Sequence, residues 1–147
     1  MATKARRPGR LALAGVIALS LGLAGIAAAW VQGPAAAPAK ARIQIHFSKF
    51  NPTEVVATAG VPTTITLVNT DPIDHEWLVG DAAFHERHRK GTEAHHGARP
   101  TEVSLPAGST VTTTVTFAKP GEYQYICHLP GHEAYGMVGV LRVLPAQ

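Results

Sequence analysis

The stretch GEYQYICHLPGHEAYGMVGVLRV, residues 121–143, carries the strongest structural signal of the chain. YQYIC near its start and GMVGVLRV at its end are apolar segments with the period-2 patterning typical of β-strands. Between them, Pro130-Gly131 and Gly136 supply residues that favour tight turns. The stretch therefore predicts two neighbouring strands that are joined by a folded loop.

Short strand patterns, separated by Pro/Gly turns, occur throughout the chain from Arg42 onward. RIQIHFSKF alternates so that Ile43, Ile45 and Phe47 share one face, and VPTTITLVNTD places Ile65 inward. DHEWLVG and STVTTTVTF add two further strands. About seven or eight such strands, rich in Val and Thr, predict an all-β fold, a Greek-key β-sandwich. We expect this domain to span residues 42–147.

One segment, residues 81–101, is too long for a hairpin loop. It reads DAAFHERHRKGTEAHHGARPT, and Asp81 is suited to N-cap a short helix over residues 82–90 that Gly91 would end. Insertions of this length on a rigid scaffold are usually surface loops and are sometimes functional. We therefore predict a short helix on an otherwise all-β domain.

The first 41 residues differ in composition from the remainder. Four basic residues lie within the first ten, an apolar run extends over residues 11–29, and the small-residue stretch QGPAAAPAKA follows. This order is typical of an export signal, but the length of the apolar run is also close to that of a membrane-spanning helix. We expect an extracytoplasmic protein (periplasmic, cell-surface or secreted), with residues 1–41 either cleaved as a signal peptide or retained as an anchor that contacts the membrane through residues 11–29.

The charge and cysteine content of residues 42–147 exclude some functions. Eight basic residues against ten acidic ones give a net charge of −2 with His neutral. That balance does not favour a nucleic-acid partner. Cys127 is the only cysteine of the chain, so no intrachain disulfide can form. Its thiol must therefore be inert, reactive or metal-ligating.

Cys127, His132 and Met137 follow one another with the spacing C-x4-H-x4-M. Taken singly, they are explained as a core thiol, a surface histidine and a packed side chain. Taken together, a thiolate, an imidazole and a thioether select copper, and two His with one Cys and a weak axial Met form a blue-copper electron-transfer site. The second histidine must come from elsewhere. His75, at the head of a strand, is the natural candidate, because the alternation around His46 directs that side chain to solvent.

These segments resemble the cupredoxin family of blue copper proteins. The resemblance covers about residues 43–144 and rests on NPTEVVATAG, TLVNTDPIDHEW and the 121–143 stretch. It implies a cupredoxin-like β-sandwich that binds one copper ion cycling between Cu(I) and Cu(II) and exchanges electrons with redox partner proteins. It also implies copper ligands at His75, Cys127, His132 and Met137. Glu76 departs from the Asn or Ser that follows the first ligand histidine in many small cupredoxins.

Other functions stay open from the sequence. The loop is also similar to the blue-copper loop of multicopper oxidases, but the chain has no His-x-His pair for a three-copper cluster. We therefore expect an electron carrier without catalytic residues, not an enzyme. The alternatives are copper delivery or resistance, and a subunit of a copper enzyme.

The remaining histidines and aromatic residues allow further predictions. The four histidines of the insertion, at positions 85, 88, 95 and 96, leave open a second metal site. We interpret His128, which follows Cys127 directly, as solvated. Trp77 and Tyr125 are predicted to lie in the core, because both stand in strand segments.

Overall fold

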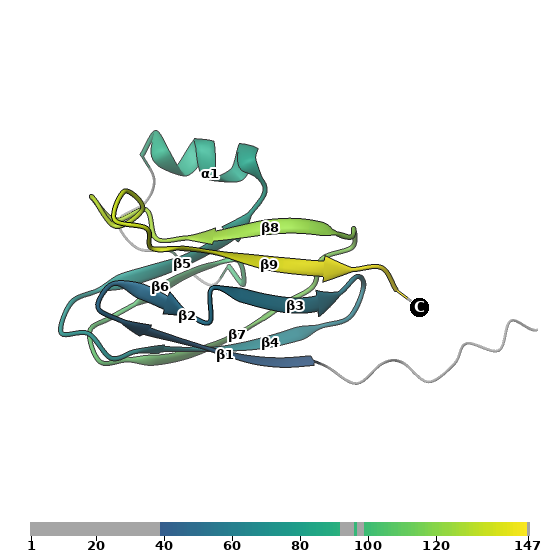
Figure 1. The fold of residues 1–147 in the computed structure, drawn as a ribbon, viewed down its shortest axis with the longest axis horizontal. Helices are drawn as coiled ribbons and strands as arrows, with labels where there is room; N and C mark the ends of the chain where they lie inside the picture. Colours follow the sequence, from purple (N-terminus) through teal and green to yellow (C-terminus); the bar gives the residue numbers. More distant parts are fainter. Residues whose placement is uncertain (1–38, 92–95, 97–98, 147) are drawn as a thin grey trace, which may run out of the picture. The chain divides into compact units, whose positions relative to one another are not determined.

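The computed structural model describes residues 39–91, 96 and 99–146. Within them, nine strands form two sheets with the orders β2-β1-β4-β7 and β3-β9-β8-β5-β6. The strands are β1 (Ala39–His46), β2 (Lys49–Asn51), β3 (Glu54–Thr58), β4 (Thr63–Asn69), β5 (His75–Gly80), β6 (Glu102–Leu105), β7 (Thr110–Val115), β8 (Gly121–Ile126) and β9 (Val138–Leu144). The sheets face each other as a sandwich, which confirms the predicted all-β fold (Figure 1).

Two parallel strand pairs join distant parts of the chain. β1 pairs with β4 and β3 pairs with β9 in parallel, while the other neighbours are antiparallel.

The core lies between the two sheets, and its fully buried side chains include Ile45, Leu67, Trp77, Tyr125 and Leu141. Full burial of one such side chain contributes about 1.5–3 kcal/mol, so this layer is the main source of stability. The prediction of Trp77 and Tyr125 as core residues is confirmed.

The turn after β1 makes β2 a separate strand, which the sequence did not indicate. Phe47 and Ser48 both have a φ of 51°, so the chain leaves the extended conformation after His46 and reverses into β2. The prediction that Phe47 shares a face with Ile43 and Ile45 is therefore wrong. Phe47 is 80% exposed, and Phe50 of β2, at 2%, occupies the core instead. β6 is the other strand that the sequence did not indicate.

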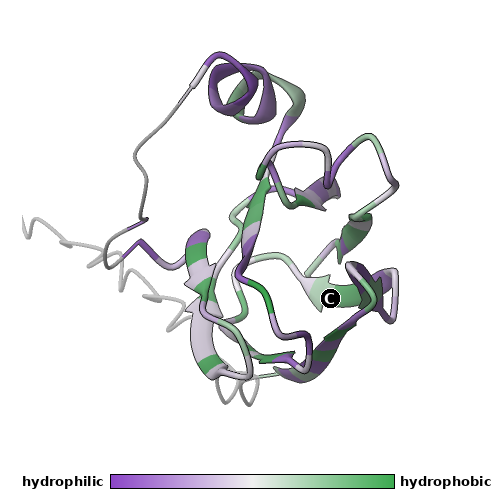
Figure 2. Ribbon diagram, turned by 90° about the vertical axis from the view of Figure 1, so that its left-hand side faces the viewer, coloured by the Kyte–Doolittle hydropathy of each residue, from purple (hydrophilic) through white to green (hydrophobic). Residues whose placement is uncertain are grey.

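The helix α1 (Ala82–Arg89) covers part of the five-stranded sheet, and it confirms the helix predicted in the insertion. Asp81 is its N-cap and accepts a hydrogen bond from the Phe84 N–H at 2.8 Å, while Gly91 follows its end with a φ of 105°. α1 packs against β5 and β8 on the outer face of the sandwich (Figure 1). Its ribbon is predominantly hydrophilic (Figure 2).

The predicted export segment falls largely outside the described residues, since these begin at Ala39. β1 starts there, so residues 39–41 belong to the first strand although the sequence placed them in the linker. Among the described residues, no helix has the length and apolar character needed to cross a membrane.

Candidate metal centre

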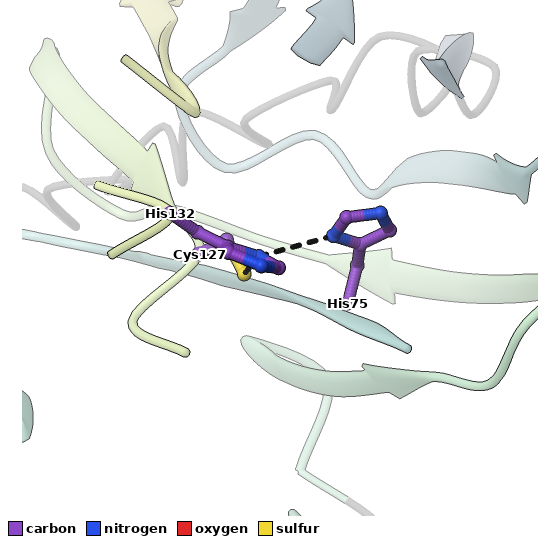
Figure 3. Close-up of side chains that lie close together, drawn as sticks. All are labelled: His75, Cys127 and His132. Atoms are coloured by element: carbon purple, nitrogen blue, oxygen red, sulfur yellow. Dashed lines mark hydrogen bonds between the residues drawn. The ribbon is translucent and has the colours of Figure 1, made fainter. Parts of the chain in front are cut away.

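The structure brings three of the four predicted ligands together at one end of the sandwich. His75 is the first residue of β5, Cys127 directly follows β8, and His132 lies in the loop between β8 and β9. One ligand atom from each of these residues lies within 4.8 Å of the others. Figure 3 shows the imidazoles of His132 and His75 facing each other, with the sulfur of Cys127 beside the ring of His132.

The nitrogen atoms that face each other are the two Nδ1 atoms. His75 Nδ1 lies 3.2 Å from His132 Nδ1, and Cys127 Sγ lies 3.2 Å from His132 Nδ1. The other ring nitrogen of His75, Nε2, lies 2.9 Å from the Asp71 carboxylate and so donates its hydrogen there. His75 Nδ1 consequently carries a lone pair directed into the centre.

The loop between β8 and β9 is held together by its own backbone hydrogen bonds. The N–H of Cys127 donates to the carbonyl of Met137, the N–H of Met137 donates to His132, and the N–H of His132 donates to Leu129, at 2.9 to 3.2 Å. Gly131 and Gly136 have φ values of 86° and 84°, a conformation that favours glycine. The predicted turn residues therefore fold the loop so that hydrogen bonds join the backbone of Met137 to those of Cys127 and His132.

Met137, the fourth predicted ligand, lies next to the other loop ligands through its backbone. Its side chain is fully buried, and both its backbone groups bond to the segments that carry Cys127 and His132. A buried thioether is a soft, polarisable group that suits copper. Its role as the weak fourth ligand stays a prediction.

The electrostatic environment favours uncharged ligands in the absence of metal. Burial raises the pKa of the Cys127 thiol to about 11, although hydrogen bonds from the backbone N–H groups of Glu76 and Leu129 act in the opposite direction. Burial also lowers the pKa of His132, and the neighbouring His75 lowers it further. At neutral pH His132 therefore offers a lone pair, whereas the thiol must lose its proton to bind a metal ion.

Asp71 is a site residue that the sequence did not single out. It is buried, and its carboxylate accepts hydrogen bonds from the N–H groups of Phe47 and Ser48 at 2.7 and 2.8 Å, as well as from His75. Burial alone would raise the pKa of Asp71, but these hydrogen bonds outweigh it and hold the pKa below its usual value. Asp71 thus fixes the ring of His75 from behind.

Glu76, the departure from the family pattern, links the centre to the insertion. It is buried, and its Oε1 accepts the N–H of His128 at 2.7 Å. Its Oε2 lies 3.2 Å from His96 Nε2. One carboxylate therefore holds the residue after Cys127 and a histidine of the insertion.

The interpretation of His128 as solvated is wrong, whereas the exposed position predicted for His46 is confirmed. The side chain of His128 is only 5% exposed, against 53% for His46. His128 Nε2 lies 2.9 Å from His85 Nδ1, and its Nδ1 lies 3.2 Å from Glu133. Burial lowers the pKa of His128 to about 4. The reason is α1, which covers this part of the sheet and could not be positioned from local sequence.

The donor set fits copper. A thiolate and a thioether are soft ligands, and imidazole is a borderline one, so hard ions such as Mg²⁺ and Ca²⁺ are disfavoured. The three facing atoms come from three segments that the sandwich holds in place. Among the predicted ligands, His75, Cys127 and His132 would hold the ion directly.

Comparison with known proteins identifies the family of this chain. A family model described as a cupredoxin-like domain matches residues 21–140. A copper-resistant cuproprotein CopI of Pseudomonas aeruginosa is 27% identical, over 65% of this chain and 71% of that protein. CopI of Rubrivivax gelatinosus is 28% identical, over 71% of this chain and 67% of that protein.

Solved structures of auracyanins share the fold. Auracyanin from Roseiflexus castenholzii, in its dithionite-reduced form, has a TM-score of 0.63 at 24% identity and covers 75% of this chain and 100% of its own. Auracyanin A from Chloroflexus aurantiacus, described as a "blue" copper protein, has a TM-score of 0.57 at 27% identity. The match covers 73% of this chain and 99% of auracyanin A. With a family model that extends over most of its length, this chain belongs to the cupredoxin-like domain family.

Proposed function

We propose that this protein is an extracytoplasmic blue copper protein that carries single electrons between redox partner proteins. The observation that supports it most is the convergence of His75 Nδ1, His132 Nδ1 and Cys127 Sγ beside the buried Met137. Copper bound there would supply a one-electron couple between Cu(I) and Cu(II). His75, Cys127 and His132 would hold the ion, and Met137 would tune it.

The arrangement of the ligands suits reversible electron transfer. His75 is fixed by Asp71, which itself binds the backbone of the β1–β2 turn. Cys127 and His132 are fixed by the hydrogen bonds within their loop. Ligands that are held this rigidly move little when the charge of the site changes, so little rearrangement opposes the transfer. We therefore propose a carrier and not an enzyme.

A second candidate function is copper resistance or delivery. Two observations favour it. The curated relatives carry the name copper-resistant cuproprotein, and the insertion places further histidines beside the centre. A resistance or delivery protein would exchange its copper with other sites, whereas a carrier would retain it through many redox cycles.

The test of the carrier proposal is the visible spectrum of the copper-loaded protein together with its voltammetry. We expect an intense thiolate-to-copper absorption and a reversible one-electron wave. Cys127→Ser should abolish the absorption while the far-ultraviolet circular dichroism is retained. His132→Gln should weaken or abolish it, and the matched control His46→Gln, which changes an exposed imidazole, should not.

Three outcomes would contradict the proposal. A Cys127→Ser variant that keeps the full absorption would exclude Cys127 as the ligand. Copper that is lost to a chelator in each redox cycle would favour delivery or resistance. Steady turnover of oxygen or nitrite by the copper-loaded protein would favour an enzyme.

A further inference from the structure

A second group of metal-ligating side chains lies in the insertion. His88 is in the last turn of α1, His96 is in the segment that follows, and Glu102 is the first residue of β6. All three are buried, with 7 to 9% of each residue exposed, and one ligand atom from each lies within 4.8 Å of the others. Buried groups of this polarity are uncommon unless they are paired or bind an ion.

Hydrogen bonds to other groups direct the remaining ring nitrogens toward Glu102. His88 Nδ1 lies 2.9 Å from the carbonyl oxygen of Phe84, so it carries the hydrogen and leaves the lone pair on Nε2. That Nε2 lies 3.8 Å from Glu102 Oε2. His96 Nε2 is directed to Glu76, while its Nδ1 lies 3.3 Å from the same Glu102 oxygen. Two imidazole nitrogens and one carboxylate oxygen therefore face a common point.

Two carboxylates and one guanidinium lie around this point. His96 lies between two buried carboxylates, those of Glu76 and Glu102. Arg99 supplies one positive charge, with its Nη1 at 2.9 Å from Glu102 Oε2. A divalent ion bound by the two imidazoles would be attracted by these carboxylates.

We propose that His88, His96 and Glu102 form a second metal site, which takes a divalent first-row transition ion, Cu(II) or Zn(II). Two imidazoles and one carboxylate are a known ligand set for such ions, and they leave a position open for water or another ligand. The general order of stabilities favours Cu(II) over Zn(II) at one set of ligands. Of the four insertion histidines, two are thus assigned, His85 bonds to His128, and His95 lies outside the described residues. The proposal revises the expectation of one ion per chain.

Two pockets give the site access to solvent. One is lined by Glu76, His88 and His128, among other residues, and the other is lined by His96 and Glu102. An ion could enter from either pocket without opening of the sandwich. An entry path of this kind is a requirement for a site that exchanges its metal.

Glu76 couples the second site to the blue-copper ligands. One of its oxygens bonds to His96, and the other accepts the N–H of His128, the residue after Cys127. Its own N–H bonds to the thiol of Cys127, and it follows His75 in the chain. An ion on His96 would polarise this carboxylate, and we expect the blue absorption and the reduction potential to shift when the second site fills.

The experiment is a metal titration of the protein as isolated, without a histidine tag, after its first site has been filled with copper. One arm adds Cu(II) and the other adds Zn(II), and the bound metal is counted after removal of the excess. We expect one further ion per chain, with an electron paramagnetic resonance signal in the Cu(II) arm that differs from the blue-copper signal and shows coupling to two nitrogens. The retained blue absorption reports that the first site is intact.

Matched variants locate the ion. Glu102→Gln and His88→Gln should each lower the affinity for the second ion at least about 100-fold. Loss of a hydrogen-bond partner behind a metal ligand lowers metal affinity by up to about 100-fold, and loss of a ligand itself should cost no less. Glu122→Gln, at an exposed carboxylate, and His46→Gln should leave it unchanged. The two arms together show whether the site prefers copper or zinc.

The proposal is overturned if the unaltered protein holds no second ion in either arm, or if Glu102→Gln and His88→Gln bind it as tightly as the unaltered protein. If the variants misfold and lose the blue absorption, the electron paramagnetic resonance signal of the unaltered protein decides whether the proposal holds. A second Cu(II) whose signal shows no coupling to nitrogen would exclude His88 and His96 as its ligands. Failure of the carrier proposal is separate, since it would appear as a missing blue absorption or a missing redox wave and not as a missing second ion.

Discussion

Asp71→Asn tests how firmly His75 is held. Asp71 Oδ1 accepts the N–H of Phe47 at 2.7 Å, and Oδ2 accepts the N–H of Ser48 at 2.8 Å and that of His75 Nε2 at 2.9 Å. An asparagine has only one oxygen, so whichever way its amide is turned, an NH₂ group meets at least one N–H donor. The substitution keeps the shape of the side chain and removes its charge.

The expected loss of stability in Asp71→Asn follows from these three hydrogen bonds. A hydrogen bond to a charged acceptor contributes about 1.5–3 kcal/mol. In Asp71→Asn at least one such bond is lost, because the NH₂ group of the asparagine faces an N–H donor. The other two lose their charged acceptor. We therefore expect the free energy of unfolding of the metal-free protein to fall by about 2–4 kcal/mol, a large part of the roughly 5–15 kcal/mol of an ordinary domain. We also expect copper affinity to fall about 10- to 100-fold, since His75 is no longer oriented.

Urea unfolding of the metal-free protein measures the first effect, and competition with a copper chelator measures the second. The matched control is Asp74→Asn in the same turn, where an exposed carboxylate accepts one N–H from Ala107 at 2.9 Å. The control should change stability by about 0.5 kcal/mol or less, as is usual at the surface. Equal losses in the two variants, or an unchanged copper affinity in Asp71→Asn, would refute the role given to Asp71.

Three further predictions concern the axial ligand, the packing of the sheet and export. Met137→Leu should keep copper and colour but shift the reduction potential, which voltammetry measures, and complete loss of copper would contradict an axial role. Gly139→Ala should lower the free energy of unfolding in urea by about 1–3 kcal/mol or more, because a Cβ there would collide with the buried ring of Tyr125; an unchanged stability would show that the ring can move. Mass spectrometry of the native protein should find either cleavage near residues 29–41 or an intact N-terminal segment in the membrane fraction, and an intact protein in the cytosol would contradict both.

Several features of the fold could be predicted because they are local. The alternation in residues 43–47 and 121–143 indicated strands, and the spacing of Cys127, His132 and Met137 with its turn glycines indicated the loop that gathers them. The N-cap Asp81 marked the start of α1 for the same reason. Where the backbone departs from the expected conformation, local pattern failed, as at Phe47, whose positive φ ends β1.

The two metal sites likewise combine features that are local in the sequence with contacts that are not. Their residue types and the spacing of the loop are properties of the sequence, and these were sufficient to indicate copper. The partners of these residues are not local. His75 meets His132 across 57 positions, Asp71 reaches the β1–β2 turn across 24, and Glu102 joins His88 only because β6 pairs with β5 beneath α1. Such contacts depend on how strands far apart in the chain pair, and no local periodicity encodes that pairing. The order of the amino acids sets which ligands are available, whereas the pairing of distant strands selects which of them share a centre.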